Sequence, residues 1–186
     1  MQVSQNCGKR KIKTAISVKV KECYDKLVQK SERNNRRMNY KTIDEMANFN
    51  FSETHIQDLQ ITSGFFHIII DDVKIKPENS CNRDIREMRA NNLLFKIEDA
   101  VIESLIEEGY KVYDANGNLR EAFEDVIVAE EERLNVMKEF ADGNLYSLEK
   151  QENKYIFTID APNEHTYSLT VSGSHDVEEW ERFLNV

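Results

Sequence analysis

The sequence predicts an α+β fold: an antiparallel sheet of four or five strands with helices packed on one face, preceded by a basic, partly helical N-terminal arm. Three features predict it. Apolar and polar residues alternate in three short segments of the C-terminal third, apolar residues recur at steps of three and four in two longer segments before them, and basic residues crowd the first 42 positions. The predicted domains are a basic arm of residues 1–62 and an acidic α+β domain of residues 63–186.

The N-terminal arm is expected to be small and thinly apolar. Residues 12–20 alternate between apolar and polar side chains and predict a short strand, and a helix is expected from residue 21 to about residue 35. The polar residues 31–40, rich in Arg and Asn, predict a solvated helix end or a mobile segment. Residues 42–51 hold apolar side chains that predict one docked helical turn.

The acidic domain begins with a predicted hairpin. Residues 65–70 form an apolar run of strand length, and residues 73–76 alternate. Asp71 and Asp72 between them predict the turn. Pro77 is expected to end the second strand, because proline has no N–H to donate to a ladder.

Two long helices are expected next. Over residues 84–108 apolar side chains recur at steps of three and four, and Gly109 is a natural C-cap. Asn116 and Gly117 predict a tight turn, and a second helix is expected from about residue 120 to residue 140. The outward-facing stripes of both predicted helices are rich in Asp and Glu.

The C-terminal third predicts a three-stranded meander with one apolar face. Its apolar positions with a period of two are Tyr146 and Leu148, then Tyr155, Phe157 and Ile159, then Tyr167, Leu169 and Val171. A closing helix is expected after Ser174, which is a plausible N-cap, with Trp180 on the apolar side that covers the meander.

The composition excludes several classes of protein. Apolar residues make up 40% of the 186 positions, which suffices for the core of one domain, and no apolar run reaches the roughly 18 residues of a membrane-spanning helix. Residues 1–10 do not resemble a secretory signal. Cys7, Cys23 and Cys81 are odd in number and widely spaced, which favours reduced thiols. We therefore expect a protein of the bacterial cytoplasm without a membrane partner.

The net charge of −9 is unevenly distributed along the chain. Residues 1–42 hold 12 basic and three acidic side chains, which gives +9, whereas residues 43–186 hold 13 basic and 31 acidic side chains, which gives −18. Such a division favours an arm that binds a nucleic acid and a body that binds a basic partner, or an arm and a body that bind each other. A soluble surface with an uneven distribution of charge is the simplest alternative.

No cofactor, metal ion or catalytic residue is predicted. The four histidines are scattered and have no spacing typical of zinc ligands. Asp114, Asn116 and Asn118 imitate the start of a calcium-binding EF-hand loop, but Leu119 occupies the position at which that loop requires glycine.

A metal-dependent nuclease is the less favoured enzymatic alternative. Such an enzyme needs acids that hold Mg²⁺ and a lysine that orients a water molecule. Asp71, Asp72 and Lys74, or Glu152 and Lys154, supply these residue types. In a chain with this many charges, however, such triplets arise readily by chance.

Two charged regions are the candidate binding sites. The basic arm could neutralise the phosphates of a nucleic acid through Lys9, Arg10, Lys11, Lys13, Arg33, Arg36 and Arg37. The acidic stripes could imitate a nucleic-acid backbone and occupy a basic channel through Asp99, Glu103, Glu107, Glu121, Glu124 and Glu131.

A short part of the chain resembles a known family. The segments SVKVKECY at residues 17–24, SERNNRR at residues 31–37 and KTID at residues 41–44 resemble the start of short sigma-factor-like proteins carried by conjugative elements and phages of Gram-positive bacteria. Those proteins continue into a helix-turn-helix that contacts promoter DNA, whereas this chain continues into the predicted sheet. The resemblance therefore implies an origin in a mobile genetic element and not promoter recognition.

The favoured hypothesis follows from this origin and from the acidic body. Small acidic proteins of mobile elements are similar in make-up to anti-CRISPR and anti-restriction proteins, which block nucleic-acid-handling effectors. We expect a non-enzymatic inhibitor of an effector with a basic nucleic-acid channel, such as a Cas nuclease. The alternative is a small DNA- or RNA-binding regulator that acts through the basic arm.

Overall fold

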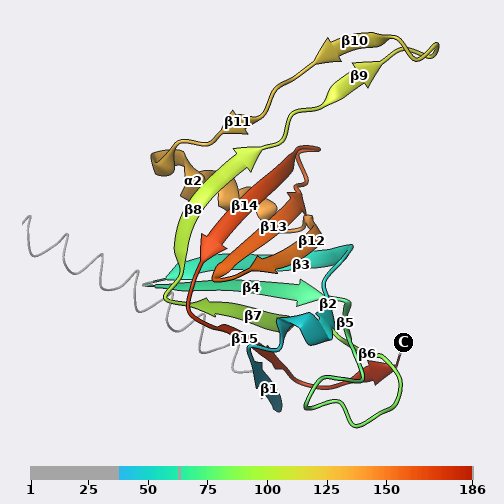
Figure 1. Ribbon diagram of the computed structural model, residues 1–186, viewed down its shortest axis with the longest axis vertical. Coiled ribbons are helices and arrows are strands. Elements are labelled where there is room, and N and C mark those ends of the chain that lie inside the picture. The colour runs from blue at the N-terminus through green and yellow to red at the C-terminus, as the bar shows by residue number, and fades with distance from the viewer. Residues whose placement is uncertain (1–37, 63, 186) are drawn as a thin grey trace, which may run out of the picture. The chain divides into compact units, whose positions relative to one another are not determined.

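The computed structural model describes residues 38–62 and 64–185, and this part of the chain is mostly β-structure (Figure 1). Its strands form sheets of ten, four and two strands. The described residues contain one α-helix, α2 (Glu130–Met137), which continues into a 3-10 turn, η2 (Lys138–Phe140). The predicted α+β class is therefore wrong. No helix of the described residues is long and apolar enough to cross a membrane.

The ten-stranded sheet is antiparallel throughout. In spatial order its strands are β1 (Tyr40–Ile43), β15 (Asp176–Trp180), β7 (Leu93–Glu98), β4 (Phe65–Asp71), β3 (Thr54–Thr62), β12 (Asn144–Gln151), β13 (Lys154–Asp160), β14 (Thr166–Ser172), β8 (Val101–Glu107) and β11 (Val126–Ile127).

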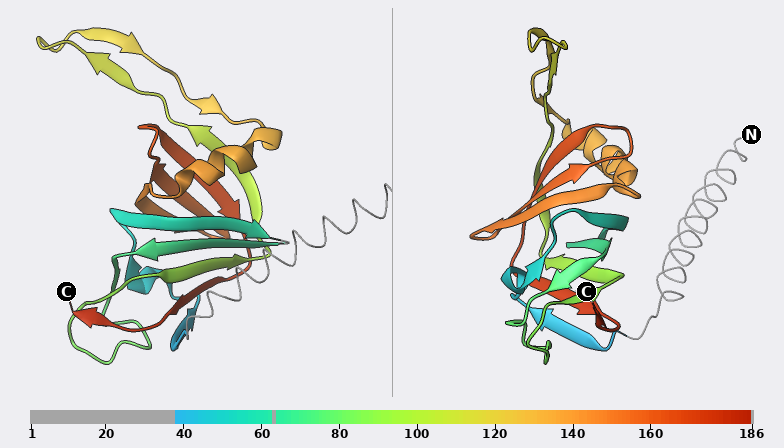
Figure 2. Two further views of the ribbon diagram at one scale, coloured as in Figure 1. Left: turned by 180° about the vertical axis from the view of Figure 1, so that it is seen from behind. Right: turned by 90° about the vertical axis from the view of Figure 1, so that its right-hand side faces the viewer.

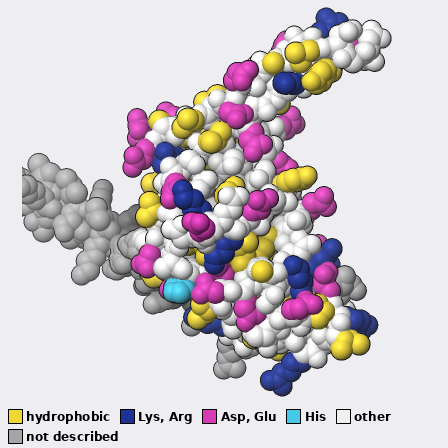
Figure 3. All heavy atoms as spheres, in the orientation of Figure 1, with side chains coloured by type: hydrophobic (Ala, Val, Ile, Leu, Met, Phe, Trp, Pro, Cys, Tyr) yellow, Lys and Arg dark blue, Asp and Glu magenta, His cyan; other side chains and the backbone are white. Residues whose placement is uncertain are grey.

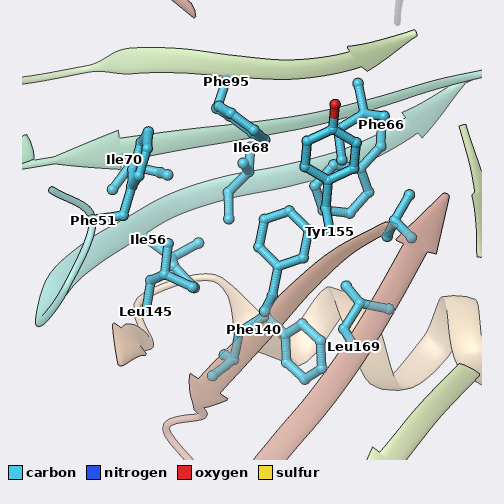
Figure 4. Close-up of a cluster of buried hydrophobic side chains, with 14 of the residues drawn as sticks. Phe51, Ile56, Phe66, Ile68, Ile70, Phe95, Phe140, Leu145, Tyr155 and Leu169 are labelled. Atoms are coloured by element: carbon cyan, nitrogen blue, oxygen red, sulfur yellow. The ribbon is translucent and has the colours of Figure 1, made fainter. Parts of the chain in front are cut away.

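This sheet bends so that its two halves face each other across the core (Figures 1 and 2). Neighbouring strands are roughly 5 Å apart, so β4 and β13, which lie three steps apart in the sheet, could not touch if the sheet were flat. Yet the rings of Phe66 on β4 and Phe157 on β13 have centroids 5.0 Å apart. Figure 4 shows inner side chains of the two halves, such as Phe66 and Leu169, close together in the core, with Phe140 of η2 among them.

Two strand connections cross from one half of the sheet to the other at a shared corner. The β7–β8 turn and the β14–β15 turn are joined there by backbone hydrogen bonds, Ser174 N–H to Glu98 O at 2.9 Å and Glu98 N–H to His175 O at 3.0 Å. A Cβ atom at Gly173 would lie 2.1 Å from the side chain of Ile97 and 2.7 Å from the carbonyl oxygen of Glu98. Glycine is therefore required where the two turns cross.

The smaller sheets lie beside this core. The four-stranded sheet has the order β16 (Leu184–Asn185), β6 (Met88–Ala90), β5 (Val73–Ile75) and β2 (Phe49–Asn50). The two-stranded sheet is a hairpin of β9 (Lys111–Tyr113) and β10 (Leu119–Ala122) that extends beyond the rest of the described body (Figures 1 and 2). A 3-10 turn, η1 (Met46–Asn48), follows β1.

The long helix predicted over residues 84–108 is wrong, because that region forms β6, β7 and β8. On β7, Leu93, Phe95 and Ile97 are fully buried, which is the period of a strand. Apolar residues that are adjacent in this segment fit both the period of a helix and the period of a strand. Their spacing alone could therefore not distinguish a helix from strands. Asp99, directly after β7, has a φ of +53°, which no residue inside an α-helix adopts.

The other helix predictions are wrong in different degrees. The predicted helix of residues 120–140 exists from Glu130 onward, and the residues before it form β10 and β11. The predicted closing helix is the strand β15, whose Trp180 is fully buried and stacks 5.5 Å from Tyr40 of β1.

The strand predictions are more successful. The meander is confirmed as β12, β13 and β14, although a bulge in β12 buries Leu145 and leaves Tyr146 exposed. The strands of residues 65–70 and 73–75 exist as β4 and β5 and turn at Asp72, which has a φ of +64°. They are not a hairpin, because β4 pairs with β3 and β7 whereas β5 pairs with β2 and β6.

Candidate functional site

The main candidate site is the segment of residues 110–127, here called the projecting hairpin, which runs from the end of β8 through β9, β10 and β11. Every side chain in it is exposed except that of Asp114, which is half-buried. Seven large apolar side chains are exposed on it: Tyr110, Val112, Tyr113, Leu119, Phe123, Val126 and Ile127. The remaining described residues expose six more, scattered over the rest of the body. Exposed apolar side chains gathered in this way are typical of interaction surfaces.

The tip of the projecting hairpin is a well-formed turn. The carboxylate of Asp114 accepts the backbone N–H groups of Asn116 and Asn118, each at 2.9 Å. These hydrogen bonds hold the pKa of Asp114 below its ordinary value. Gly117 has a φ of +82°, which the predicted Asn-Gly turn requires. The tip is therefore shaped by its own sequence.

Contacts between its two strands close the base of the projecting hairpin. Phe123 N–H donates to Tyr110 O at 2.8 Å, and the two rings stack with centroids 4.5 Å apart. Gly109 N–H donates to the carboxylate of Asp125 at 2.8 Å. A Cβ atom at Gly109 would lie 2.1 Å from the carbonyl oxygen of Phe123, so only glycine allows this close approach. The chain thus leaves and re-enters the body at one defined point.

Both faces of the projecting hairpin carry apolar side chains. Tyr113 pairs with Leu119 across the two strands, and Val112 pairs with Glu121. Because successive side chains of a strand point to opposite faces, Tyr113 and Leu119 lie on one face and Val112 lies on the other.

The base of the projecting hairpin and the first turn of α2 are strongly acidic, whereas the hairpin itself, residues 110–127, holds four acidic and two basic side chains. Residues 108–132 hold eight acidic and two basic side chains, a net charge of −6. One of the two basic residues, Arg120, lies 3.5 Å from the carboxylate of Asp114. Figure 3 shows acidic and hydrophobic side chains side by side along this end of the molecule. The surface is therefore apolar with an acidic border.

The predicted acidic residues do not form stripes on two helices. Asp99, Glu103 and Glu107 lie in the β7–β8 turn and on β8, Glu121 and Glu124 lie on the projecting hairpin, and Glu131 lies on α2.

The first three of these carboxylates already have partners. Glu103 sits in a β-bulge of β8 and contacts Lys154 at 2.5 Å, which lowers the pKa of Glu103. Glu107 lies 2.6 Å from His165, and Asp99 accepts a hydrogen bond from the Ser174 hydroxyl at 2.9 Å.

The other three carboxylates are free to meet a partner. Within residues 38–62 and 64–185, no ion pair involves Glu121, Glu124 or Glu131. All three are exposed.

The predicted basic binding residues lie outside the described residues. They are Lys9, Arg10, Lys11, Lys13, Arg33, Arg36 and Arg37.

The carboxylates of the predicted nuclease triplets are divided among different structural contacts. Asp71 accepts the backbone N–H of Asn92 at 2.6 Å and a hydrogen bond from Gln57, and Asp72 pairs with Arg89 at 3.0 Å. In the second triplet, Glu152 occupies a turn with a φ of +56°, and the ammonium group of Lys154 is held by Glu103.

A cluster of polar and charged side chains that leads from the surface to buried Asp176 is the second candidate site, and the sequence analysis missed it. It consists of Asp44, Lys150, Tyr155, His175, Asp176 and Glu178. Asp176 is fully buried and accepts hydrogen bonds from the Tyr155 hydroxyl at 2.8 Å, the Met46 N–H at 3.1 Å and the Lys150 ammonium group. Asp44 lies 2.7 Å from His175 and 3.6 Å from Lys150.

The pKa shifts in this cluster leave three of its groups protonated at neutral pH. Burial opposes the charge on Lys150, but its hydrogen bonds to Asp176 and Tyr155 and their negative charge together outweigh burial and raise the pKa of Lys150 above its ordinary value. Burial raises the pKa of Tyr155 to about 12. Burial, with the neighbouring Asp176, raises the pKa of Glu178 to about 9. At neutral pH these are an ammonium ion, a phenol and a carboxylic acid, so none of the three acts as a general base.

The cluster therefore has a structural role. Thr42 of β1 donates to Glu178 of β15 at 2.6 Å, and Asp176 of β15 holds the start of η1 through the Met46 N–H. These bonds fasten the first described strand to the corner of the sheet. Asp176, Val177 and Glu178 are all buried, so the spacing of side chains along this strand carries no signal that its two acids are buried.

A hollow with a volume of about 830 Å³ lies between Tyr40, Phe183 and the loop of residues 80–85. The buried amide of Asn82 at its edge donates to three backbone carbonyls and accepts from the Asp84 N–H, so it holds the loop itself. Among the described residues, no three His, Cys, Asp or Glu side chains lie close enough together to hold a metal ion.

The described body is thus a bent antiparallel β protein with one projecting hairpin. Comparison with known proteins adds no relative, because no family model, curated protein or solved structure matches the chain.

Proposed function

We propose that this chain is a non-enzymatic binding protein that inhibits a nucleic-acid-handling effector in the manner of an anti-CRISPR protein. The acidic end of the body would occupy the effector's basic channel. The observation that carries this proposal is the projecting hairpin, where exposed apolar side chains stand beside Glu121 and Glu124, two exposed carboxylates with no ion pair in the described chain. Charge of this kind speeds association with a basic surface, and apolar contact then holds the complex.

Binding is favoured over catalysis by the state of the charged groups. The buried cluster around Asp176 is occupied by its own hydrogen bonds, and the acids of the nuclease triplets serve turns and strand contacts. Exposed carboxylates such as Glu121, Glu124 and Glu131 carry the charge that a partner would meet. The alternative, a DNA- or RNA-binding regulator, depends on basic residues of the N-terminal arm.

A cleavage assay with guide-loaded Cas nucleases tests the proposal. The full chain is added to each nuclease of a panel, and cleavage of its DNA or RNA target is measured. A triple variant, E121Q/E124Q/E131Q, removes three carboxylates from the acidic end. The matched control, E53Q/E78Q/E152Q, removes three exposed carboxylates elsewhere on the body and changes the net charge equally.

We expect the wild-type chain and the control to inhibit one nuclease and the acidic-end variant to lose inhibition. Because channel binding depends on screened charge, inhibition should also weaken between low salt and about 0.3 M salt. Failure of the wild-type chain to inhibit any nuclease, or equal inhibition by the two triple variants, would contradict the proposal.

A further inference from the structure

We propose that the projecting hairpin inserts into a cleft of a partner protein, with apolar walls against both faces of the hairpin and basic residues at the cleft's rim. This inference rests on the proposed function and specifies how the partner is held. It concerns the shape and chemistry of the partner's surface, which the inhibition assay alone does not determine.

The distribution of apolar side chains favours a cleft over a flat surface. A hairpin that lies on a flat surface needs apolar side chains on one face, as a sheet with one solvated face does. Here Tyr113 and Leu119 occupy one face, Val112 occupies the other, and all three are exposed. The stacked pair of Tyr110 and Phe123 adds apolar surface at the base. Contact on both faces is needed to remove these side chains from water together.

The construction of the projecting hairpin suits insertion. An isolated two-stranded hairpin is marginally stable in water and gains most from packing against another structure. The Asp114 turn fixes the tip, and the bonds of Gly109 and Phe123 fix the base, so the hairpin is held before it meets a partner. A binding element ordered in advance loses less conformational entropy when it binds.

The charge of the segment selects the occupant. The projecting hairpin holds four acidic and two basic side chains, and Glu108, Glu130, Glu131 and Glu132 flank its base, so a second copy of this chain would bring like charges together and a nucleic acid would add its own negative charge. In a protein with Lys and Arg at the rim of an apolar cleft, the basic rim complements the acidic side chains and the apolar walls complement the apolar side chains of this surface. The partner is therefore a basic protein.

Site-specific photocrosslinking of the full chain tests the two-sided contact. A benzophenone amino acid replaces Tyr113 on one face or Val112 on the other, and Tyr146, which is 57% exposed on β12, serves as the control position. The variants are produced in the bacterium that encodes the chain, the cells are irradiated, and the crosslinked peptides are identified by mass spectrometry. We expect positions 113 and 112 to link to the same protein, at residues on opposite walls of one cleft bordered by Lys and Arg, and position 146 not to link.

Single substitutions then measure each face against the identified protein. Because Tyr113 and Val112 are exposed, Tyr113→Ser and Val112→Ser leave folding intact, and each is expected to weaken binding by at least about tenfold. Tyr146→Ser is the matched control and is expected to change binding less than about twofold.

The outcomes separate this inference from the proposed function. Crosslinks from one face only, crosslinks between two copies of this chain, no crosslink at either hairpin position, or an effect of one serine substitution without the other would overturn the cleft. If both faces link to one basic cleft of a protein that does not handle nucleic acids, the proposed function fails while the inference is supported.

Discussion

Replacing Glu178 by glutamine is expected to stabilise the protein, by an amount that grows with pH. Glu178 is fully buried on β15, and burial together with the adjacent Asp176 raises the pKa of its carboxyl from an ordinary 4.5 to about 9. The folded chain therefore binds a proton that the unfolded chain has released at neutral pH. Glutamine keeps the shape and the oxygen that accepts the Thr42 hydroxyl without needing that proton.

The size of the effect follows from the linkage between proton binding and folding. Below pH 4.5 both states hold the proton, so the full contribution of protonated Glu178 to stability is present. Between pH 4.5 and about 9 the folded state alone holds it, and this contribution falls by roughly 1.4 kcal/mol per pH unit. At pH 7 the glutamine variant should be more stable by up to about 3 kcal/mol, and the difference should shrink toward pH 5.

Urea unfolding followed by tryptophan fluorescence measures this difference, because Trp180 is the single tryptophan of the chain and is buried two residues beyond Glu178. The control is Glu179→Gln on the opposite face of β15, which removes an ion pair with Lys96 at 2.7 Å. That control should lose about 1–2 kcal/mol at every pH from 5.5 to 8. A stability difference between wild type and Glu178→Gln that does not change over this range would refute the reasoning.

Three further predictions concern the body. Gly173→Ala forces a Cβ atom to within 2.1 Å of a neighbouring side chain and should lower the free energy of unfolding by more than about 2 kcal/mol. Gly117→Ala, in a turn with open space around it, should lower it by only about 1 kcal/mol. Urea unfolding measures both changes. Asp44→Asn removes the negative charge that strengthens the hydrogen bond to His175 and raises the pKa of its imidazole. Its destabilising effect should therefore be larger at pH 5.5, where the imidazole is charged in both states, than at pH 8, and thermal melts at the two pH values would show the difference. Phe157→Ala opens a cavity in the fully buried core and should cost about 3–5 kcal/mol; a loss below about 1 kcal/mol would contradict the position assigned to this ring.

The part of the fold that the sequence predicts best is the meander of the C-terminal third. Tyr155, Phe157 and Ile159 on β13 are fully buried, as alternation predicts. The turn at Asn116 and Gly117 was also predictable, because glycine readily adopts the φ of +82° that Gly117 has there.

The helix predictions failed where sequence spacing was ambiguous or where distant residues decide the structure. Residues 84–108 satisfy the helical and the strand period at once, and pairing with β4, β14 and β15 decides in favour of strands. On β15, Asp176 and Glu178 could be assigned to a buried strand only with knowledge of Lys150 and Thr42, which neutralise or bond them from other parts of the chain.

The candidate site was predictable in chemistry and not in shape. The acidic character of Glu121, Glu124 and Glu131 was expected from the charge distribution. Their place on a projecting hairpin could not be expected, because alternation within β9 and β10 covers very few residues and the segment packs against nothing that would set its period. The exposed Tyr113 and Phe123 were the missed signal, since two large aromatic side chains beside an Asn-Gly turn are unusual on a free surface.

Shortening the projecting hairpin tests the central claim most directly. Replacing residues 111–122 by Asn-Gly leaves the Phe123 N–H to Tyr110 O bond to close a two-residue turn and removes side chains that are nearly all exposed. We expect the shortened chain to keep its melting temperature within about 3 °C and to lose inhibition of the target nuclease in the cleavage assay. A shortened chain that folds and inhibits as well as the full chain would contradict the claim that this hairpin is the binding site.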